Sequence, residues 1–318
     1  MVYFGLLLLL FVLEFLYFKI AYHFNIIDKP NERSSHRQVT LRGGGVLFFL
    51  SMVVYALCFG MAYPWFLLGL TLIATVSFVD DISSVSLKVR IFVHFISMLL
   101  MFYQWGLFHL FPWWYLALGL VFCTGIVNAY NFMDGVNGIT GGYSIVAVLT
   151  LLYLNDEVVL YIDNELLYML LLALFVFCFF NFRTRAKCFA GDVGSVGLAF
   201  ILLFILGKLI LQTDSLYWLV LLAVYGVDSI LTIVHRLMLH ENIFMAHRKH
   251  AYQLLANELR VPHLWVSAFY MVLQLCINVG AVALFHTPYR WAYFVAIVFL
   301  LSMAYAAFIK KVLQADRF

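Results

Sequence analysis

The chain has 318 residues, of which 65% are hydrophobic and 11% are charged, with a net charge of +3 and a mean hydropathy of +1.00. A soluble domain of this length cannot bury so much apolar side chain, so the composition excludes a water-soluble enzyme and indicates a protein that lies in a bilayer. The apolar runs are continuous and lack the alternation of membrane-barrel strands, which favours helices.

Eleven apolar segments follow one another and are predicted to be membrane-spanning helices. The first is too long for the core of a signal peptide and lacks a basic start and a small-residue cleavage site, so we expect it to be retained. The expected fold class is all-α, a polytopic integral membrane protein of about 10–11 spans that forms one domain over residues 1–318. The predicted spans are 2–22, 46–61, 64–79, 91–108, 110–127, 139–154, 164–181, 194–212, 216–234, 264–286 and 290–309.

Positive charge is distributed unevenly between the two sides of this predicted bundle. Sixteen of the nineteen Lys and Arg residues fall in loops on one side, whereas the other side carries Arg290 and an acidic patch that includes Asp156 and Glu157. Cytoplasmic loops of membrane proteins carry the excess of Lys and Arg. We therefore expect a multi-pass protein of the inner (plasma) membrane with its N-terminus outside and its basic loops in the cytoplasm.

The first basic loop, 28–42, contains His36 and ends at three glycines, Gly43, Gly44 and Gly45, where the second span begins. One interpretation is a cytoplasmic loop whose charge sets the topology and whose glycines form a hinge. The other is an anion-binding loop, in which glycines let the backbone approach a ligand at a helix N-terminus. The loop alone does not decide between them.

Asp80 and Asp81 lie at the cytoplasmic end of the third predicted span. Two adjacent carboxylates repel each other, and the C-terminus of a helix already carries partial negative charge. Lys88 or Arg90 could compensate them in a purely structural role. A divalent cation or a role in proton transfer explains the pair better, and oxygen ligands of this kind suit Mg²⁺ or Mn²⁺ rather than zinc.

A run of amides and one carboxylate follows the fifth predicted span. Asn128, Asn131 and Asp134 are three residues apart, which predicts one broad helical face, and Gly135 and Gly138 are expected to break the helix there. Capping of a helix end is the structural alternative. A membrane protein gains nothing from such a polar ridge unless a polar ligand binds to it, so we expect a binding surface.

Asp192 lies at the start of the eighth span, within FAGDVGS at 189–195. A structural N-cap would explain an acidic residue there, and a metal ligand would explain it equally. Asp228 lies inside the ninth span, and the sequence identifies no partner for it.

The long loop 235–263 carries His247, Arg248 and His250. Two histidines alone make a poor zinc site, whereas a basic cluster suits phosphate. Residues 251–260 have a modest apolar face that fits a helix along the membrane surface.

These segments, in this order, resemble the polyprenyl-phosphate N-acetylhexosamine-1-phosphate transferases, glycosyltransferase family 4, which include the undecaprenyl-phosphate GlcNAc-1-phosphate transferases. The matching segments are DKPNERSSH…GGG at 28–45, VDD at 79–81, NAYNFMDGVNG at 128–138, FAGDVGS at 189–195 and AHRKHAYQ at 246–253. The resemblance covers nearly the whole chain. It is specific for the family and not for the sugar.

The resemblance implies a chemistry and a set of roles. Mg²⁺ bridges the diphosphate of a UDP-HexNAc, the phosphate of a polyprenyl carrier attacks the β-phosphorus, and UMP leaves; Mn²⁺ is a possible substitute. The resemblance implies no nucleic-acid partner and leaves undecided whether the protein forms a homodimer. The implied catalytic residues are Asp80, Asp81, Asp134 and Asp192; the metal ligands are Asp192, Asp134 and Asn131; and the substrate-binding residues are Asn128, Asn131, His36, His247, Arg248 and His250.

Two positions depart from the family pattern. Many bacterial relatives carry Asp where this chain has Asn137, so a charged role at this position is in doubt. The related phospho-MurNAc-pentapeptide translocase has three consecutive histidines where this chain has HRKH at 247–250. This difference favours a GlcNAc-type or modified HexNAc donor and the branch that initiates cell-envelope glycans such as O-antigen or capsule.

Two alternatives have different sequence requirements. A multi-span transporter of anionic solutes should carry ionisable groups near the middle of the membrane, whereas the charges here gather at one face. An intramembrane prenyltransferase also uses Mg²⁺ and aspartates, but its aspartates follow a DDxxD pattern, and Asp80-Asp81 is followed by Ile82, Ser83 and Ser84.

Overall fold

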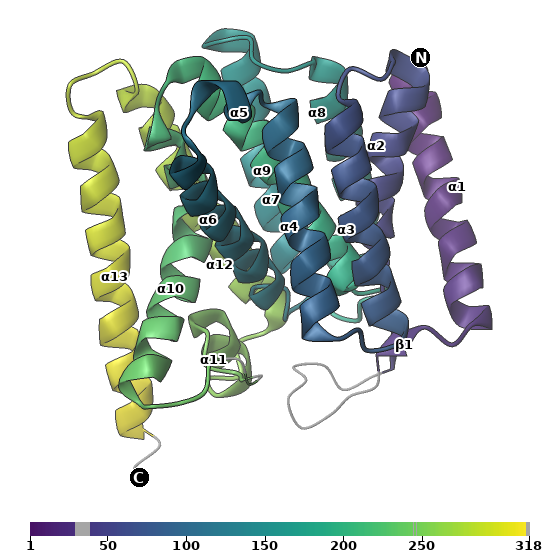
Figure 1. The fold of residues 1–318 in the computed structure, drawn as a ribbon. Coiled ribbons are helices and arrows are strands. Elements are labelled where there is room, and N and C mark those ends of the chain that lie inside the picture. The colour runs from purple at the N-terminus through teal and green to yellow at the C-terminus, as the bar shows by residue number, and fades with distance from the viewer. Residues whose placement is uncertain (29–38, 244, 246, 316–318) are drawn as a thin grey trace.

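The computed structural model describes residues 1–28, 39–243, 245 and 247–315, and it is a bundle of helices with two very short strands (Figure 1). The strands pair antiparallel, Ile27 opposite Leu41 and Asp28 opposite Thr40. The elements are α1 (Val2–His23), β1 (Ile27–Asp28), β2 (Thr40–Leu41), α2 (Val46–Phe59), α3 (Pro64–Ile82), α4 (Leu87–Gln104), α5 (Leu107–Leu110), α6 (Trp113–Phe132), α7 (Ile139–Glu157), α8 (Asn164–Asn181), α9 (Gly191–Thr213), the 3₁₀ helix η1 (Leu216–Leu222), α10 (Ala223–Met238), α11 (Ala251–Asn257), α12 (His263–Leu284) and α13 (Arg290–Ala315).

The all-α membrane fold predicted from composition is confirmed. Within the described residues, ten helical segments are long and apolar enough to cross a membrane, with η1 and α10 acting as one segment. The remaining apolar helix, α2, has 14 residues and a length of about 21 Å, which is shorter than the hydrocarbon core of roughly 30 Å. All eleven predicted spans therefore exist as helices, and ten of them have the length of a full span.

Several predicted helix ends were wrong by three residues or more, the end of α13 at Ala315 by six. The helix predicted over 91–108 runs from Leu87 to Gln104, and the one predicted over 110–127 runs from Trp113 to Phe132. Apolarity marks where a segment meets lipid, whereas hydrogen bonding marks where the helix ends. As a result, Asn128 and Asn131 lie on α6 itself rather than beyond it.

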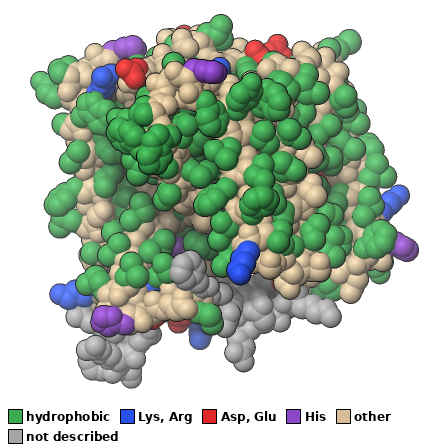
Figure 2. All heavy atoms as spheres, in the orientation of Figure 1, with side chains coloured by type: hydrophobic (Ala, Val, Ile, Leu, Met, Phe, Trp, Pro, Cys, Tyr) green, Lys and Arg blue, Asp and Glu red, His purple; other side chains and the backbone are tan. Residues whose placement is uncertain are grey.

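Helix α9 forms the centre of the bundle. It packs against α2, α3 and α6. In its most apolar 18-residue stretch 83% is buried inside the protein, compared with 6% for the peripheral helix α13. A helix that is apolar all round is stable only when it is surrounded by protein or lipid. Figure 1 shows α1 and α13 at opposite edges of the bundle, and Figure 2 shows hydrophobic side chains across the middle of one face, as expected for contact with lipid.

The N-termini of α2 and α9 meet backbone to backbone. A Cβ atom at Gly194 would lie 2.6 Å from the Cα of Gly45, so neither position has room for a side chain. The amides of Gly44 and Gly45 donate to the carbonyls of Phe189 (2.8 Å) and Ala190 (3.1 Å). The close backbone approach expected at the glycines therefore occurs, but to α9 and the residues before it, and these two amides are not free for an anion.

Candidate active site

Five chain segments bring their polar ends to one end of the bundle. They are the β2–α2 junction with Arg42, the end of α3 with Asp80 and Asp81, the start of α4 with Arg90, the end of α6 with Asn131 and the start of α9 with Asp192. Figure 1 shows β1, α11 and the end of α13 at the same end, opposite the N-terminus. The convergence predicted from the alternation of the loops is thus present in the fold.

Asp81 fixes the beginning of α9. Its carboxylate oxygens accept hydrogen bonds from the amides of Asp192 (2.8 Å) and Val193 (3.0 Å), and Nε of Arg42 lies 2.7 Å from Oδ1. The first amides of a helix have no partner within the helix, and a carboxylate is stabilised beside them. The N-cap role considered for Asp192 therefore belongs to Asp81 of another helix.

Asp80 points to α4 rather than to α9. It accepts from the amide of Val85 (2.7 Å), and Nη1 of Arg90 lies 2.6 Å from Oδ2. Arg90 is one of the two residues considered as structural compensation for the acidic pair, and it forms an ion pair with Asp80. The two adjacent carboxylates avoid repulsion because they face different helices and different guanidinium groups.

Asp192 lies between these two pairs. Nη2 of Arg90 is 3.2 Å from Oδ2, and Nη2 of Arg42 is 3.6 Å from Oδ1. Its side chain is partly exposed, so the carboxylate is accessible from the end of the bundle. Three carboxylates and two guanidinium groups thus form one connected cluster, which we call the carboxylate–arginine cluster: Asp80, Asp81, Asp192, Arg42 and Arg90.

The end of α6 joins this cluster through one amide. Nδ2 of Asn131 donates to Oδ1 of Asp192 (3.1 Å) and to Oγ of Ser195 (2.9 Å). Asn128, one turn earlier on α6, is exposed. Asp134 lies two residues beyond the end of the helix, so only the two asparagines share a regular helical face.

Asp134 is a partly buried carboxyl group near Asp192. Desolvation raises the pKa of Asp134 to about 6, the nearby hydroxyl of Thr140 opposes this shift, and the negative charge of Asp192 adds to it. Within the described part of the chain, Asp134 forms no ion pair. A cation at this position would stabilise the ionised form.

The oxygen donors at this end of the bundle fit Mg²⁺ in kind. Asp192, Asp134 and Asn131 offer carboxylate and amide oxygens, which a hard divalent cation prefers. No group of three His, Cys, Asp or Glu side chains among the described residues is arranged to hold a metal on its own. Mg²⁺ is commonly bound by one or two carboxylates together with water and substrate phosphates, so this incomplete set suits a cation that arrives with a diphosphate.

The loop with His247 and His250 packs against the end of α6. The two imidazole rings lie 5.0 Å apart between centroids, although this segment is not helical. Tyr252 of α11 donates its hydroxyl to the carbonyl of Phe132 (2.8 Å), and Gly135 leaves room for that ring. The basic loop is thus attached to the polar ridge at 128–138.

Electrostatics within this loop keep His247 neutral. Its partial burial, with the nearby His250, Arg236 and Lys249, lowers the pKa of His247 to about 4. Arg248 is partly buried in the same loop. At neutral pH the positive charge of this segment therefore comes from arginine and lysine rather than from His247.

Two positions considered in the sequence analysis remain, His36 and Asn137. His36 falls outside the described residues. Asn137 is buried, and its Nδ2 donates to the carbonyl of Arg183 (2.8 Å), while its own carbonyl accepts from Oγ of Ser267 (2.8 Å). The doubt about a charged role at position 137 agrees with this structural role.

Sequence reasoning missed the roles of Arg42 and Asp228. In the sequence, Arg42 contributed only to the positive charge of the first loop. Its place directly before the three glycines could have indicated that it contacts the helix packed against them. Asp228 is buried inside a span, and an ionisable residue at such a position is a candidate for function by default. Its partners lie in α11 and α12 and cannot be read from the sequence around it.

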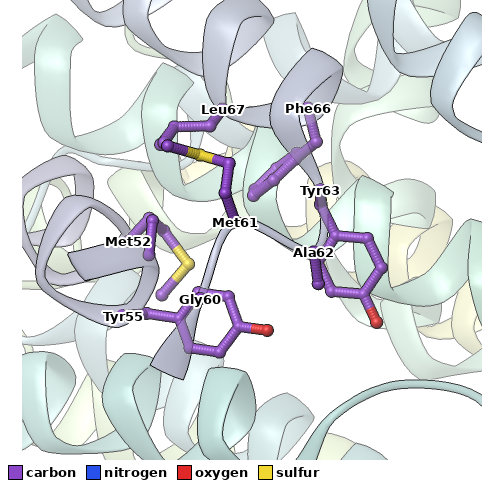
Figure 3. A pocket seen from close by; sticks show the side chains of 9 residues that line it. Met52, Tyr55, Gly60, Met61, Ala62, Tyr63, Phe66 and Leu67 are labelled. Carbon is purple, nitrogen blue, oxygen red and sulfur yellow. The ribbon is translucent and has the colours of Figure 1, made fainter. Parts of the chain in front are cut away.

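A pocket elsewhere in the bundle has a different character. It lies at the α2–α3 connection and is lined by apolar and aromatic residues that include Met52, Tyr55, Tyr63 and Phe66 (Figure 3). Asp80 is at the other end of α3, about 24 Å away along the helix axis. This pocket therefore does not belong to the carboxylate–arginine cluster.

The fold and the cluster together define a polytopic membrane protein with an oxygen-rich, arginine-lined site at one end of the bundle. Residues 63–210 match the family model described as glycosyl transferase family 4, a range that runs from α3 to α9 and includes Asp80, Asp81, Asn131, Asp134 and Asp192. Over this range, just under half of its length, the chain is similar to the membrane-bound transferases of glycosyl transferase family 4.

Curated relatives agree with this assignment at modest identity. The chain is similar to the undecaprenyl-phosphate alpha-N-acetylglucosaminyl 1-phosphate transferase of Yersinia pestis, at 29% identity over 62% of this chain and 60% of that protein. It is 26% identical to the probable undecaprenyl-phosphate N-acetylglucosaminyl 1-phosphate transferase of Bacillus subtilis (strain 168), over 73% of this chain and 70% of that protein. The alpha-N-acetylglucosaminyl enzyme of Escherichia coli (strain K12) is 25% identical over 97% of this chain and 91% of that protein.

Proposed function

We propose that this chain transfers a HexNAc-1-phosphate group from a UDP-sugar to a polyprenyl phosphate, undecaprenyl phosphate in bacteria, and releases UMP. The observation that carries the proposal is the carboxylate–arginine cluster at one membrane face, of which Asp80, Asp81, Arg90 and Asp192 lie in the region that matches the transferase family. The names of the relatives support both the lipid acceptor and a GlcNAc-type donor. Neither a solute transporter nor a prenyltransferase requires this combination.

The reaction requires little covalent chemistry from the protein. An oxygen of the lipid phosphate forms a bond to the β-phosphorus of the UDP-sugar, and the bond from that phosphorus to the bridging oxygen breaks, so UMP carries the electron pair away. A lipid phosphate is already largely ionised at neutral pH, and phosphoryl transfer depends mainly on alignment and charge neutralisation. Residues that hold anions in place therefore matter more than a strong base.

The roles of the carboxylates follow from their positions. Asp192, Asp134 and Asn131 would hold Mg²⁺, which when bound neutralises the diphosphate. Asp80 and Asp81 would position the lipid phosphate, Asp80 together with Arg90 and Asp81 by fixing the start of α9. Arg42 and Arg90 neutralise Asp192 in this structure, and they become available to phosphate oxygens when the cation takes over that task.

The sugar and nucleotide would be held by the remaining polar residues. Asn128 and Asn131 on α6 face the donor, and His247, Arg248 and His250 approach it from the loop attached to Phe132. His36 is included because of its place in the motif at 28–45. The HRKH sequence at 247–250 and the relatives' names favour a GlcNAc-type donor. The HRKH sequence also favours a product that starts a cell-envelope glycan such as O-antigen or capsule.

The site would face the cytoplasm, where UDP-sugars are made. The basic loops lie at the same end as the cluster, and the positive-inside rule assigns this end to the cytoplasm. With termini at opposite ends of the bundle, the N-terminus would lie outside.

The proposal is tested by exchange of labelled UMP into a panel of UDP-HexNAc donors, with purified protein, undecaprenyl phosphate and Mg²⁺. Exchange with at least one donor is expected, because the reverse of the transfer re-forms the UDP-sugar. Folded protein that gives no exchange with any member of the panel contradicts the proposal, and the donor that exchanges fastest identifies the sugar.

A further inference from the structure

Asp228 is a buried carboxylate on α10 that the proposed chemistry does not use directly. Oδ2 accepts a hydrogen bond from the hydroxyl of Tyr270 on α12 (2.7 Å), and Oδ1 accepts from the amide of Ala251 at the start of α11 (2.9 Å). The hydroxyl of Thr232 lies 3.2 Å from Oδ1. Three helices therefore meet at this carboxylate, and one of them begins where the basic loop ends.

His250, the last residue of the loop before α11, has an ionisable side chain that contacts Asp228. Nδ1 of His250 lies 3.5 Å from Oδ1 of Asp228, and the imidazole is only 2% exposed. The buried Nε2 of the same ring has no hydrogen-bond partner within the described residues. A buried polar atom without a partner is destabilising, so its presence calls for an explanation in function.

The same helix holds the loop at a second point. Arg236, two turns after Asp228 on α10, donates from Nη2 to the carbonyl of Asn242 (2.6 Å) and pairs through Nε with Glu241 (3.1 Å). Glu241 in turn pairs with Lys249, the residue before His250. The loop is thus attached to α10 at both of its ends.

We propose that Asp228 is a positioning residue that orients His250 toward the diphosphate of the donor and holds the His247–His250 loop against the end of α6. The inference rests on the proposed function, because it requires His250 to contact the substrate. A carboxylate beside Nδ1 keeps the proton on that nitrogen and leaves Nε2 to face the ligand, and its negative charge stabilises an imidazolium next to phosphate oxygens.

The link to the rest of the site runs through α11. Ala251 and Tyr252 donate their amides to Asp228, and the Tyr252 hydroxyl donates to the carbonyl of Phe132. Loss of the charge at Asp228 therefore releases His250 and weakens the hydrogen bonds that hold the start of α11. The carboxylate–arginine cluster keeps all of its own contacts. A substitution that removes this charge should lower turnover, and it should do so only when His250 is present.

A double-mutant cycle separates positioning from a merely structural role. Asp228→Asn is expected to lower UMP exchange by about 10- to 100-fold, the range typical for residues that orient a functional histidine. In a His250→Gln background, the same Asp228→Asn change should have no further effect. If it costs the same factor in both backgrounds, Asp228 acts on the fold alone and the inference is wrong.

Controls keep the cycle interpretable. Asp163→Asn is the matched control, because Asp163 also accepts a tyrosine hydroxyl, that of Tyr55, but lies at the opposite end of the bundle; exchange should be unchanged. Tyr270→Phe removes one hydrogen bond to Asp228 without changing charge and serves if Asp228→Asn fails to fold. It should lower exchange less than Asp228→Asn does, and again only when His250 is present.

The outcomes also separate this inference from the proposed function. Wild-type protein without exchange on any UDP-HexNAc contradicts the function itself. Active wild-type protein in which His250→Gln exchanges normally, or in which the two changes are additive, contradicts only the positioning of His250 by Asp228.

Discussion

At the scale of single residues, the site depends on carboxylates that each have a separate partner. Asp81 faces the amides of α9, Asp80 faces Arg90, and Asp192 lies between two guanidinium groups. Arginine binds carboxylates and phosphates in the same geometry, so the contacts seen without substrate are suited to exchange for phosphate contacts. The same substitution of Asp by Asn should therefore affect stability and activity differently at these three positions.

Asp192→Asn should abolish most of the exchange activity while leaving the fold intact. The side chain makes no helix cap, so the change removes charge at the proposed cation and keeps hydrogen bonding to Asn131 available. We expect a loss of at least about 100-fold, the size seen when one electrostatic contact to a transition state is removed. The measurement is UMP exchange at saturating donor, and near-normal turnover in Asp192→Asn would contradict the assignment.

Asn137→Asp should weaken the fold without improving activity. The substitution replaces an amide that donates to the carbonyl of Arg183 by a carboxylate that repels it, in a buried setting. The expected loss is about 1–3 kcal/mol of stability, measured as a lower thermal unfolding midpoint in detergent. Asn128→Asp, a change at an exposed position of the same segment, is the control for stability. A gain in turnover with unchanged stability would restore a catalytic role at 137.

At this scale, the sequence predicted most of the polar residues but not their contacts. Asn131 and Asp192 are 61 positions apart in the chain, and they meet because α6 packs against α9. Arg42 and Asp228 were missed because their partners belong to other helices, and periodicity along one segment carries no information about them. Asn128 was grouped with Asn131 by spacing, although its side chain is exposed.

At the scale of helices, the site depends on how closely α2 approaches α9. The contact between Gly45 and Gly194 places Arg42, three residues before Gly45, beside the start of α9. Small residues at helix interfaces in membranes permit such close backbone packing. A side chain at either glycine would separate the helix that carries Asp192 from the guanidinium group that neutralises it.

Gly194→Ala should therefore reduce both stability and exchange. The added methyl group would lie 2.6 Å from the Cα of Gly45 and 2.8 Å from the Cβ of Ala190, and overpacking of this kind costs about 1–3 kcal/mol. Gly197→Ala on the same helix is the matched control, because its added Cβ meets nothing within 4 Å. We expect a lower unfolding midpoint for Gly194→Ala and an unchanged or higher one for Gly197→Ala; equal midpoints would show that the approach is not tight.

Helix ends were the part of the fold that the sequence predicted least well. The number and order of the helices followed from apolar runs, since lipid requires such runs to be long. The end of α6 did not, because Asn128 and Asn131 continue its hydrogen bonding past the point where apolarity stops. The positive φ of Gly138 (84°) and the hydrogen bond from its amide to Asn181 (2.7 Å) then start α7 in a new direction.

At the scale of the whole molecule, the alternating loops give the protein two chemically different ends. The basic loops, α11 and the carboxylate–arginine cluster share one end, while Asp163 and the pocket at the α2–α3 connection lie at the other. A transferase that joins a water-soluble nucleotide sugar to a lipid phosphate requires its site at the membrane face where the nucleotide sugar is made. The architecture meets this requirement if the basic end is cytoplasmic.

Single-cysteine labelling tests this orientation across α8. Asp163 and Lys187 flank this helix and are exposed, and the native cysteines can be replaced by serine because all five are free. In intact cells, a membrane-impermeant maleimide should label Asp163→Cys, whereas Lys187→Cys should react only after permeabilisation. The reverse pattern would place the cluster outside and contradict the proposed source of the donor.

The measurement that tests the central claim most directly is UMP exchange by purified protein with undecaprenyl phosphate. We predict that labelled UMP enters a UDP-HexNAc, that chelation of divalent cations stops the exchange and that added Mg²⁺ restores it, because Asp192, Asp134 and Asn131 supply only part of a cation's ligands and the diphosphate supplies others. Exchange that continues without any divalent cation would contradict the proposed metal site. Folded protein that exchanges UMP into no UDP-HexNAc at all would contradict the function.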